Sequence, residues 1–144
     1  MNEELTCFKA YDVRGELGPE FNNETCYQIA RAFAQVIGKN KVVVGWDARE
    51  TSPDLSKSVI QGLIDEGATV INIGLAGTEE MYWGTTYFEA CGGIEVTASH
   101  NPINFNGLKM VKSASQPLDP ISDFMMIKQI AEKNDFKRIK LGGQ

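Results

Sequence analysis

The order of apolar patterns along the chain is the feature that most constrains its fold. Three short runs rich in β-branched residues, KVVVGWD, TVINIG and GIEVTA, alternate with segments whose apolar residues recur at helical spacing. Short continuous apolar runs are typical of strands buried on both faces, and helices between them carry the chain back to the start of the next strand. This alternation predicts a three-layer αβα sandwich, in which helices cover both faces of a mainly parallel mixed sheet.

Two helical segments carry start and stop signals. NNETCYQIARAFAQVIGKN opens with two asparagines, either of which can cap the first turn, and it stops at Gly38. SPDLSKSVIQGLIDEGA offers Ser52 as N-cap with Pro53 at the first helical position, and Gly67 lies at its far end. We expect one helix from each segment.

The remaining segments complete the predicted order. A third helix, capped by Thr78, is expected over TEEMYWGTTYFEA, and a fourth from about Asp119 to Lys133. LKMV is expected to form a further short strand. Residues 1–144 are then one domain, with 135–144 as a linker toward a second domain.

Composition and charge argue against several classes of protein. The 144 residues carry a net charge of -5 and no basic stripe interleaved with aromatic residues, so we expect no nucleic-acid partner. No apolar run approaches the roughly 20 residues that span a bilayer, and the N-terminus lacks the pattern of a signal peptide. The three cysteines show neither a zinc-binding nor a disulfide spacing. We therefore expect a cytoplasmic globular protein with no membrane partner.

The stretch GGIEVTASHNPINFNGLKM combines an apolar strand with a dense polar turn. Ligands of open α/β sheets gather beyond the carboxyl ends of the strands, where this turn is expected to lie. Such residues also form ordinary turns, and a lone histidine is more often structural than catalytic. The density of polar groups favours the handling of a phosphoryl group, whose negative charge needs donors and cations. The residues concerned are Ser99, His100, Asn101, Asn104, Asn106, Gly107 and Lys109.

Four motifs together resemble the N-terminal domain of the α-D-phosphohexomutases, and most closely their bacterial phosphomannomutase branch. The motifs are TASHNP, NGLK, KAYDVRG and GWDARETS, and the resemblance spans essentially the whole chain. TASHNP is a highly specific string, whereas GWDAR alone would be weak. The chain departs from many relatives before its third helix, where it has GLAGTEEM in place of a proline-rich link.

The resemblance implies an enzyme that interconverts mannose 6-phosphate and mannose 1-phosphate through a hexose bisphosphate. Ser99 would carry the transferred phosphoryl group, and one oxygen of that phosphate would be a ligand of Mg²⁺. The other metal ligands in this family are aspartates of a DGDxDR-like loop in the second domain, and this sequence contains no such loop. Hexose 1,6-bisphosphate is the implied activator.

The resemblance also implies roles around Ser99. His100 and Asn101 would hydrogen-bond the phosphoserine, Lys109 would neutralise charge and help to move a proton, and Arg14 would bind phosphate. The residues implied to line the cleft or bind phosphate further include Tyr11 and Asn106. Three residues are expected to support the loops instead: Asp12, which would tie its loop, and Asp47 and Arg49, which would form an ion pair.

A hexose phosphate and the C-terminal domains of the same protein are the implied partners. Without those domains we expect the isolated chain to lack mutase activity. The alternative is a noncatalytic module of the same fold that binds a phosphate ligand or a protein. Phosphorylation of Ser99 would favour the enzyme.

Overall fold

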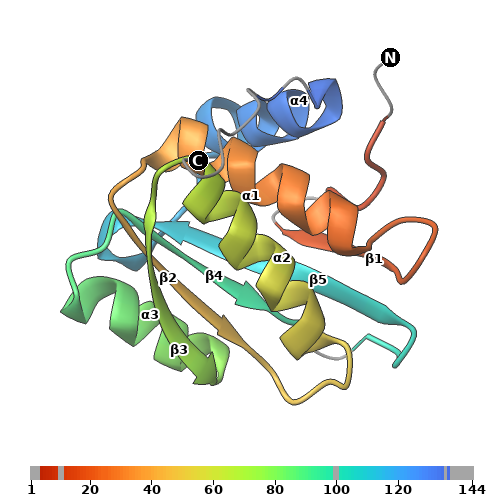
Figure 1. Ribbon diagram of the computed structural model, residues 1–144, viewed down its shortest axis with the longest axis horizontal. Helices are drawn as coiled ribbons and strands as arrows, with labels where there is room; N and C mark the ends of the chain where they lie inside the picture. The colour runs from red at the N-terminus through yellow and green to blue at the C-terminus, as the bar shows by residue number, and fades with distance from the viewer. Residues whose placement is uncertain (1–3, 10–11, 99–100, 135, 137–144) are drawn as a thin grey trace, which may run out of the picture.

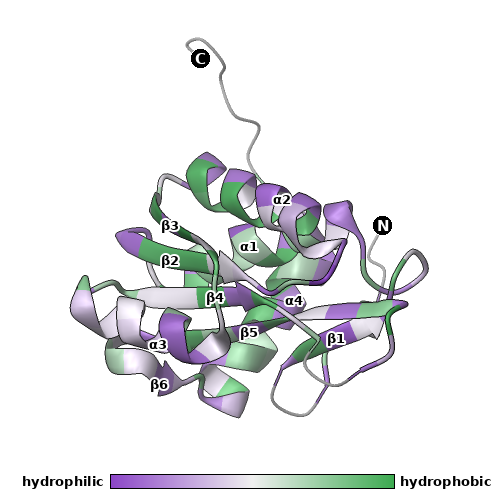
Figure 2. Cartoon of the chain, turned by 90° about the horizontal axis from the view of Figure 1, so that it is seen from below, coloured by the Kyte–Doolittle hydropathy of each residue, from purple (hydrophilic) through white to green (hydrophobic). Residues whose placement is uncertain are grey.

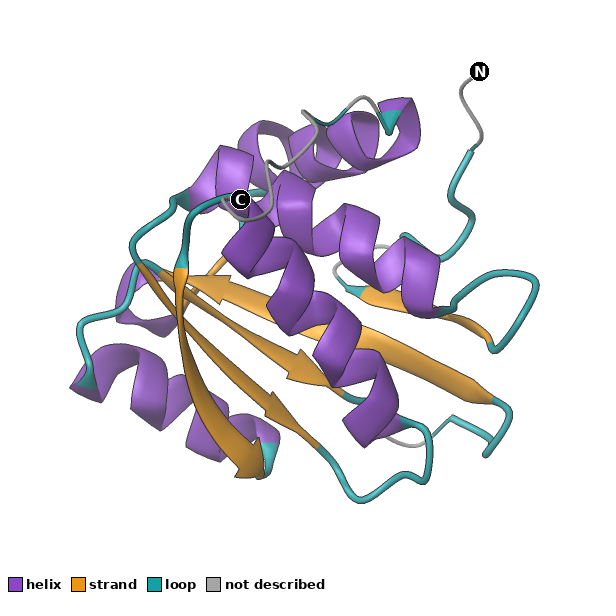
Figure 3. Cartoon of the chain, viewed as in Figure 1, coloured by secondary structure: helices purple, strands orange, loops and turns teal. Residues whose placement is uncertain are grey.

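A six-stranded mixed sheet lies between two layers of helices in the computed structural model, which describes residues 4–9, 12–98, 101–134 and 136 (Figures 1 and 3). The strands are β1 (Val13–Glu16), β2 (Lys41–Trp46), β3 (Thr69–Leu75), β4 (Gly92–Val96), β5 (Phe105–Lys112) and β6 (Gln116–Pro117). The α-helices are α1 (Asn23–Ile37), α2 (Ser52–Asp65), α3 (Thr78–Tyr87) and α4 (Met126–Lys133).

The sheet has a parallel part and an antiparallel part. Its order is β1-β5-β4-β2-β3, with β6 added to β5. Strand β2 is parallel to both β3 and β4, whereas β5 is antiparallel to β4, β1 and β6. The predicted αβα sandwich with a mixed sheet is confirmed, and its parallel part comprises three strands. It ends at β4 because a loop, and not a crossover helix, leads from β4 to β5.

Helices α1, α2 and α4 cover one face of the sheet and α3 covers the other (Figure 1). The larger core cluster lies between α1, α2 and the sheet, and includes Phe33, Ile94 and Leu108, which are fully buried. On the α3 side, Val43 and Met81 belong to a smaller cluster. Figure 2 shows the apolar character of β2, which lies between both layers. Each fully buried side chain of this size contributes roughly 1.5–3 kcal/mol, so the larger cluster dominates the stability of the domain.

The first helix begins where the sequence predicts. Asn22 is its N-cap: the side chain accepts a hydrogen bond from the Thr25 N–H at 3.0 Å, and the Thr25 hydroxyl accepts one from the Asn22 N–H at 2.8 Å. These contacts are local, which is why sequence signals find them.

Two other predicted caps are wrong by one residue. The N-cap of α2 is Thr51, and Ser52 is already helical, because the Ser52 hydroxyl donates to Asp47 Oδ1 at 2.5 Å and does not cap the helix. The N-cap of α3 is Gly77 and not Thr78, and its N–H donates to the Glu80 carboxylate at 2.6 Å.

The predicted fourth helix has two parts. Residues 120–125 form a π-helix, whose N-cap is Asp119, and α4 follows directly. No helix among the described residues is long and apolar enough to cross a membrane.

Candidate functional site

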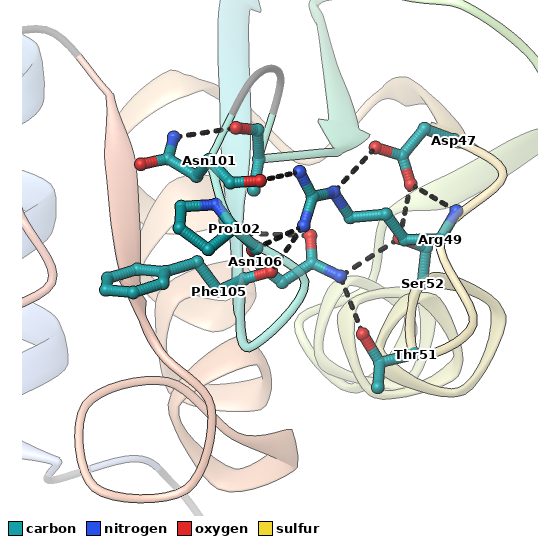
Figure 4. A network of polar contacts seen from close by, with 10 residues as sticks. Asp47, Arg49, Thr51, Ser52, Asn101, Pro102, Phe105 and Asn106 are labelled. Atoms are coloured by element: carbon teal, nitrogen blue, oxygen red, sulfur yellow. Dashed lines mark hydrogen bonds and ion pairs between the residues drawn. The ribbon is translucent and has the colours of Figure 1, made fainter.

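Arg49, in the loop after β2, holds the loop that follows β4 (Figure 4). Its guanidinium donates to the carbonyl oxygens of Pro102 at 2.7 Å and Phe105 at 3.1 Å, and also to that of Asn101. A planar group with five N–H donors can serve several acceptors at once. The segment 101–105 is therefore fixed to the carboxyl end of β2.

Asp47 orients this arginine. Its Oδ2 lies 3.8 Å from Arg49 Nε, and its Oδ1 accepts from the Arg49 N–H at 3.0 Å. The predicted Asp47–Arg49 ion pair is thus present. We call Asp47, Arg49 and the three carbonyls that Arg49 binds the Arg49 clamp.

Asn106 lies at the start of β5, next to the clamp, and is fully buried. Its amide nitrogen donates to the hydroxyls of Thr51 at 2.9 Å and Ser52 at 3.0 Å, and its oxygen accepts from the Gly107 N–H at 2.8 Å. These contacts join β5 to the beginning of α2 (Figure 4). Asn106 supports the loop in this geometry, and its predicted contact with phosphate stays a prediction.

A second cluster gathers around Asp12. Its Oδ1 lies 3.1 Å from Arg14 Nε, and its Oδ2 lies 3.3 Å from Lys109 Nζ. One carboxylate therefore serves two cations, from β1 and β5. The side chains of Arg14 and Lys109 are 41% and 31% exposed, so both remain accessible to an anion.

Gly107 allows the two strands of this cluster to meet. It pairs with Arg14 in the β1–β5 register, and a Cβ at position 107 would lie 2.0 Å from the Val13 carbonyl oxygen. The close approach of β1 therefore leaves no room for a side chain at the glycine of the NGLK motif. It brings Arg14 and Asp12 beside Lys109.

A cavity of about 350 Å³ opens beside this cluster. Asp12 and Lys109 line it together with Tyr82 of α3 and Leu118 and Phe124 of the segment after β5. The cluster thus faces a hollow where a small molecule has room.

Three predicted site residues, Tyr11, Ser99 and His100, lie outside the described residues. Among the described residues on either side of Ser99 and His100, Asn101 binds Ala98. The Asn101 N–H and its side-chain amide both donate to the Ala98 carbonyl oxygen, at 3.0 Å and 2.7 Å. The other predicted residues fall into two groups. Asp47, Arg49, Asn101 and Asn106 share the first network, and Asp12, Arg14 and Lys109 share the second.

The described part of the chain contains no group of three or more His, Cys, Asp or Glu side chains that could hold a metal ion. These residues alone therefore do not fit a complete magnesium site. What the two networks offer instead is positive charge and a fixed backbone, which suits an anion.

Glu95 is a residue that sequence reasoning missed. It lies in β4 and is fully buried, and neither carboxyl oxygen has a hydrogen-bond partner among the residues that the structure describes. Burial, together with the smaller effect of the charges of Asp47 and Glu80, raises the pKa of this carboxyl to about 8. The available signal was a single acidic residue inside the apolar run GIEVTA.

Comparison with known proteins identifies the domain. The family model for phosphoglucomutase/phosphomannomutase, alpha/beta/alpha domain I, matches residues 5–138. A phosphomannomutase of Klebsiella pneumoniae is 48% identical over 133 residues, which cover 92% of this chain and 85% of that protein. A phosphomannomutase of Vibrio cholerae is 47% identical over 146 residues, which cover 98% of this chain and 32% of that protein.

Solved structures agree with the sequence comparisons. The crystal structure of a phosphoglucomutase/phosphomannomutase family protein from Burkholderia thailandensis superposes with a TM-score of 0.79 at 29% identity. The match covers 93% of this chain and 31% of that one, so the chain spans about a third of this longer relative. The chain belongs to the phosphoglucomutase/phosphomannomutase family and has the fold of its domain I.

Proposed function

We propose that this chain is the phosphoserine-bearing domain of a phosphohexomutase that interconverts mannose 6-phosphate and mannose 1-phosphate. The observation that carries the proposal is the pairing of the two networks. The Arg49 clamp fixes the backbone of residues 101–105, which follow Ser99 in the sequence, and Arg14 and Lys109 bring two accessible cations to Asp12. The name phosphomannomutase of several relatives supports mannose as the sugar.

The proposed reaction consists of two phosphoryl transfers, one from Ser99 to the sugar and one from the sugar back to Ser99. The bond between phosphorus and the Ser99 oxygen breaks while a sugar hydroxyl of the hexose phosphate forms a new bond to phosphorus. The proton that this hydroxyl loses is balanced by the proton that the Ser99 oxygen gains. The product is a hexose bisphosphate, which reorients and returns its other phosphoryl group to Ser99. Such transfers need preorganised positive charge more than covalent help from the protein.

This chain's residues would supply that charge and the positioning. Arg14 presents a fork of donors that fits phosphate oxygens, and Lys109 neutralises charge and assists proton movement at the serine oxygen. His100, Asn101 and Tyr11 would contact the phosphoryl group or the substrate. The amide of Asn101 now donates to Ala98, so it would have to exchange that bond for one to phosphate.

Mg²⁺ would lower the negative charge on the phosphoryl oxygens when bound through the phosphoserine. We propose that its remaining ligands, and most contacts to the sugar, come from other domains. Hexose 1,6-bisphosphate would restore the phosphoserine if it were lost.

The test has two parts, for anion binding and for chemistry. Amide chemical shifts of the chain titrated with inorganic phosphate should change first at residues 12–14, 98, 101 and 109. In a complete protein carrying this domain, glucose 1,6-bisphosphate should add the mass of one phosphoryl group, and Ser99→Ala should abolish both this addition and turnover.

The phosphorylation and turnover results separate the enzyme from the noncatalytic module. A module of the same fold would bind phosphate or a protein but would never become phosphorylated. Wild-type turnover by Ser99→Ala would show that Ser99 is not the nucleophile.

A further inference from the structure

Glu95 occupies an unusual position for an acidic residue. In the register of β4 it lies opposite Gly45 of β2 on one side and Lys109 of β5 on the other. A Cβ on Gly45 would lie 2.8 Å from Glu95 Oε1 and 3.0 Å from Ile73 Cγ1. The carboxyl therefore lies over Gly45, beside Ile73 of β3.

No hydrogen bond from the described residues offsets the cost of burying this carboxyl group. The residue is 0% exposed, and no hydrogen bond reaches either oxygen from the described residues. A buried carboxylate without donors is far less stable than the neutral acid, so the group holds its proton.

The charged groups of the surrounding elements reinforce this state. Asp47 follows β2 and Glu80 lies in the first turn of α3, and both raise the pKa of Glu95. The cation of the neighbouring strand, Lys109, pairs with Asp12 at 3.3 Å. From β3 the neighbour is Ile73, which carries no charge.

Ionisation of Glu95 would act on the Arg49 clamp through Asp47. A new negative charge would repel Asp47, whose two oxygens bind the Arg49 backbone and side chain and the Ser52 hydroxyl. Arg49 in turn holds the carbonyls of residues 101, 102 and 105. A short path therefore leads from the Glu95 proton to the loop after β4.

We propose that Glu95 is a proton-responsive support of this loop: the uncharged acid is compatible with the Arg49 clamp, and loss of its proton loosens the clamp. The inference goes beyond the proposed function, since it holds whether or not Ser99 is ever phosphorylated.

The direct test is a residue-specific NMR titration of the chain between pH 5 and pH 9.5. The Glu95 carboxyl carbon should titrate near pH 8, in line with a pKa raised to about 8. The amide shifts of Asn101, Ile103 and Phe105 should change with the same midpoint. In Glu95→Gln, which keeps the shape without the charge, this loop transition should disappear.

Unfolding provides an independent readout with a defined sign. The folded pKa of about 8 exceeds the ordinary value of 4.5, so the folded state binds the proton more tightly than the unfolded chain. Relative to Glu95→Gln, the wild type should therefore lose stability as pH rises from about 5 to 8. The unfolding equilibrium constant should rise by up to about tenfold per pH unit, and the difference should level off above pH 8.

Two further variants keep the proposal falsifiable. Glu79→Gln removes an exposed acid from the same first turn of α3 and should leave the loop transition unchanged. If Glu95→Gln does not fold, Glu95→Met, of similar length and without polar atoms, should fold and lack the transition. A Glu95 midpoint near 4.5, or a loop transition that persists without Glu95, would overturn the proposal.

Discussion

Arg49 and Arg14 show how differently two arginines of one domain can be used. The guanidinium of Arg49 is committed to backbone carbonyls and to Asp47, and its side chain is 15% exposed. Arg14 binds a single carboxylate and leaves 41% of its side chain exposed. The first arginine therefore shapes the loop, whereas the second is the one with surface left for a ligand.

Arg49→Lys should weaken the loop without removing the charge. An ammonium group cannot reach three carbonyls in the geometry of a planar fork, so at least one acceptor loses its partner. We expect the free energy of unfolding to fall by about 1–3 kcal/mol. The amide of Phe105, which donates to the Pro102 carbonyl at 3.0 Å, should exchange faster with solvent. Thermal unfolding and hydrogen exchange measure both effects.

Arg14→Lys is the matched control for this change. The exposed position predicts a change in stability of less than about 0.5 kcal/mol, but turnover by a complete protein carrying this domain should be impaired. Equal stability of the two variants would contradict the clamp, and unchanged kinetics in Arg14→Lys would remove Arg14 from the cleft.

At the scale of the elements, strand β5 joins the two clusters. Asn106 and Phe105 at its beginning belong to the first network, and Lys109, three or four residues further on, belongs to the second. Strand β1 contributes Arg14 to the second network only because it lies close against Gly107. The distance between the clusters is therefore set by a single extended segment.

Gly107→Ala should separate β1 from β5. The added Cβ would lie 2.0 Å from the Val13 oxygen, which is a backbone atom and can move only with its strand. We expect a loss of more than about 3 kcal/mol and the loss of phosphate-induced shifts at Arg14.

Gly84→Ala is the control. Gly84 lies inside α3, and a Cβ at this position would make an ordinary contact of 3.5 Å with Val43 of β2. Alanine favours helix, so this variant should be as stable as the wild type or more stable by up to about 1 kcal/mol. If both glycine variants were equally stable, the close approach of β1 would not be essential.

The elements that the sequence predicted well are those with local causes. The first helix is defined by Asn22 and Thr25, which contact each other within one turn. The Asp47–Arg49 pair is similarly local. Strand β1 was not predicted, because four residues carry little pattern and its pairing with β5 depends on residues far away in the chain.

The rest of the site depends on tertiary contacts that no motif displays. Arg49 binds carbonyls more than fifty residues away, and every residue type offers a carbonyl. Ser52 was predicted to be a cap, but a nearby carboxylate binds its hydroxyl. No described residue forms a hydrogen bond with the Glu95 carboxyl, and this is a property of packing that the residue type alone does not reveal.

At the scale of the whole molecule, the proposed function assigns to the chain one side of a reaction centre. It contributes two accessible cations and the phosphoserine candidate, and it spans 32% of the Vibrio relative. The described residues offer no group of three metal-ligating side chains. A phosphoryl transfer of the proposed kind needs more contacts than these.

We therefore expect the 144-residue chain to show no multiple turnover of mannose 1-phosphate in a coupled assay. Charge neutralisation by Mg²⁺ and orientation of the sugar would both be incomplete. A complete protein carrying this domain is the positive control. Sustained turnover by the chain alone would show that its own residues are sufficient.

The bonding of β5 to three neighbouring strands has a consequence for how this domain can vary. Adjacent residues of a strand face opposite sides, so the insertion or deletion of one residue would exchange the two faces of β5. Lys109 would then enter the core that Leu108 fills, and Asp12 would lose its partner. A change of one residue in the length of β5 would therefore disrupt the core and the cation cluster together.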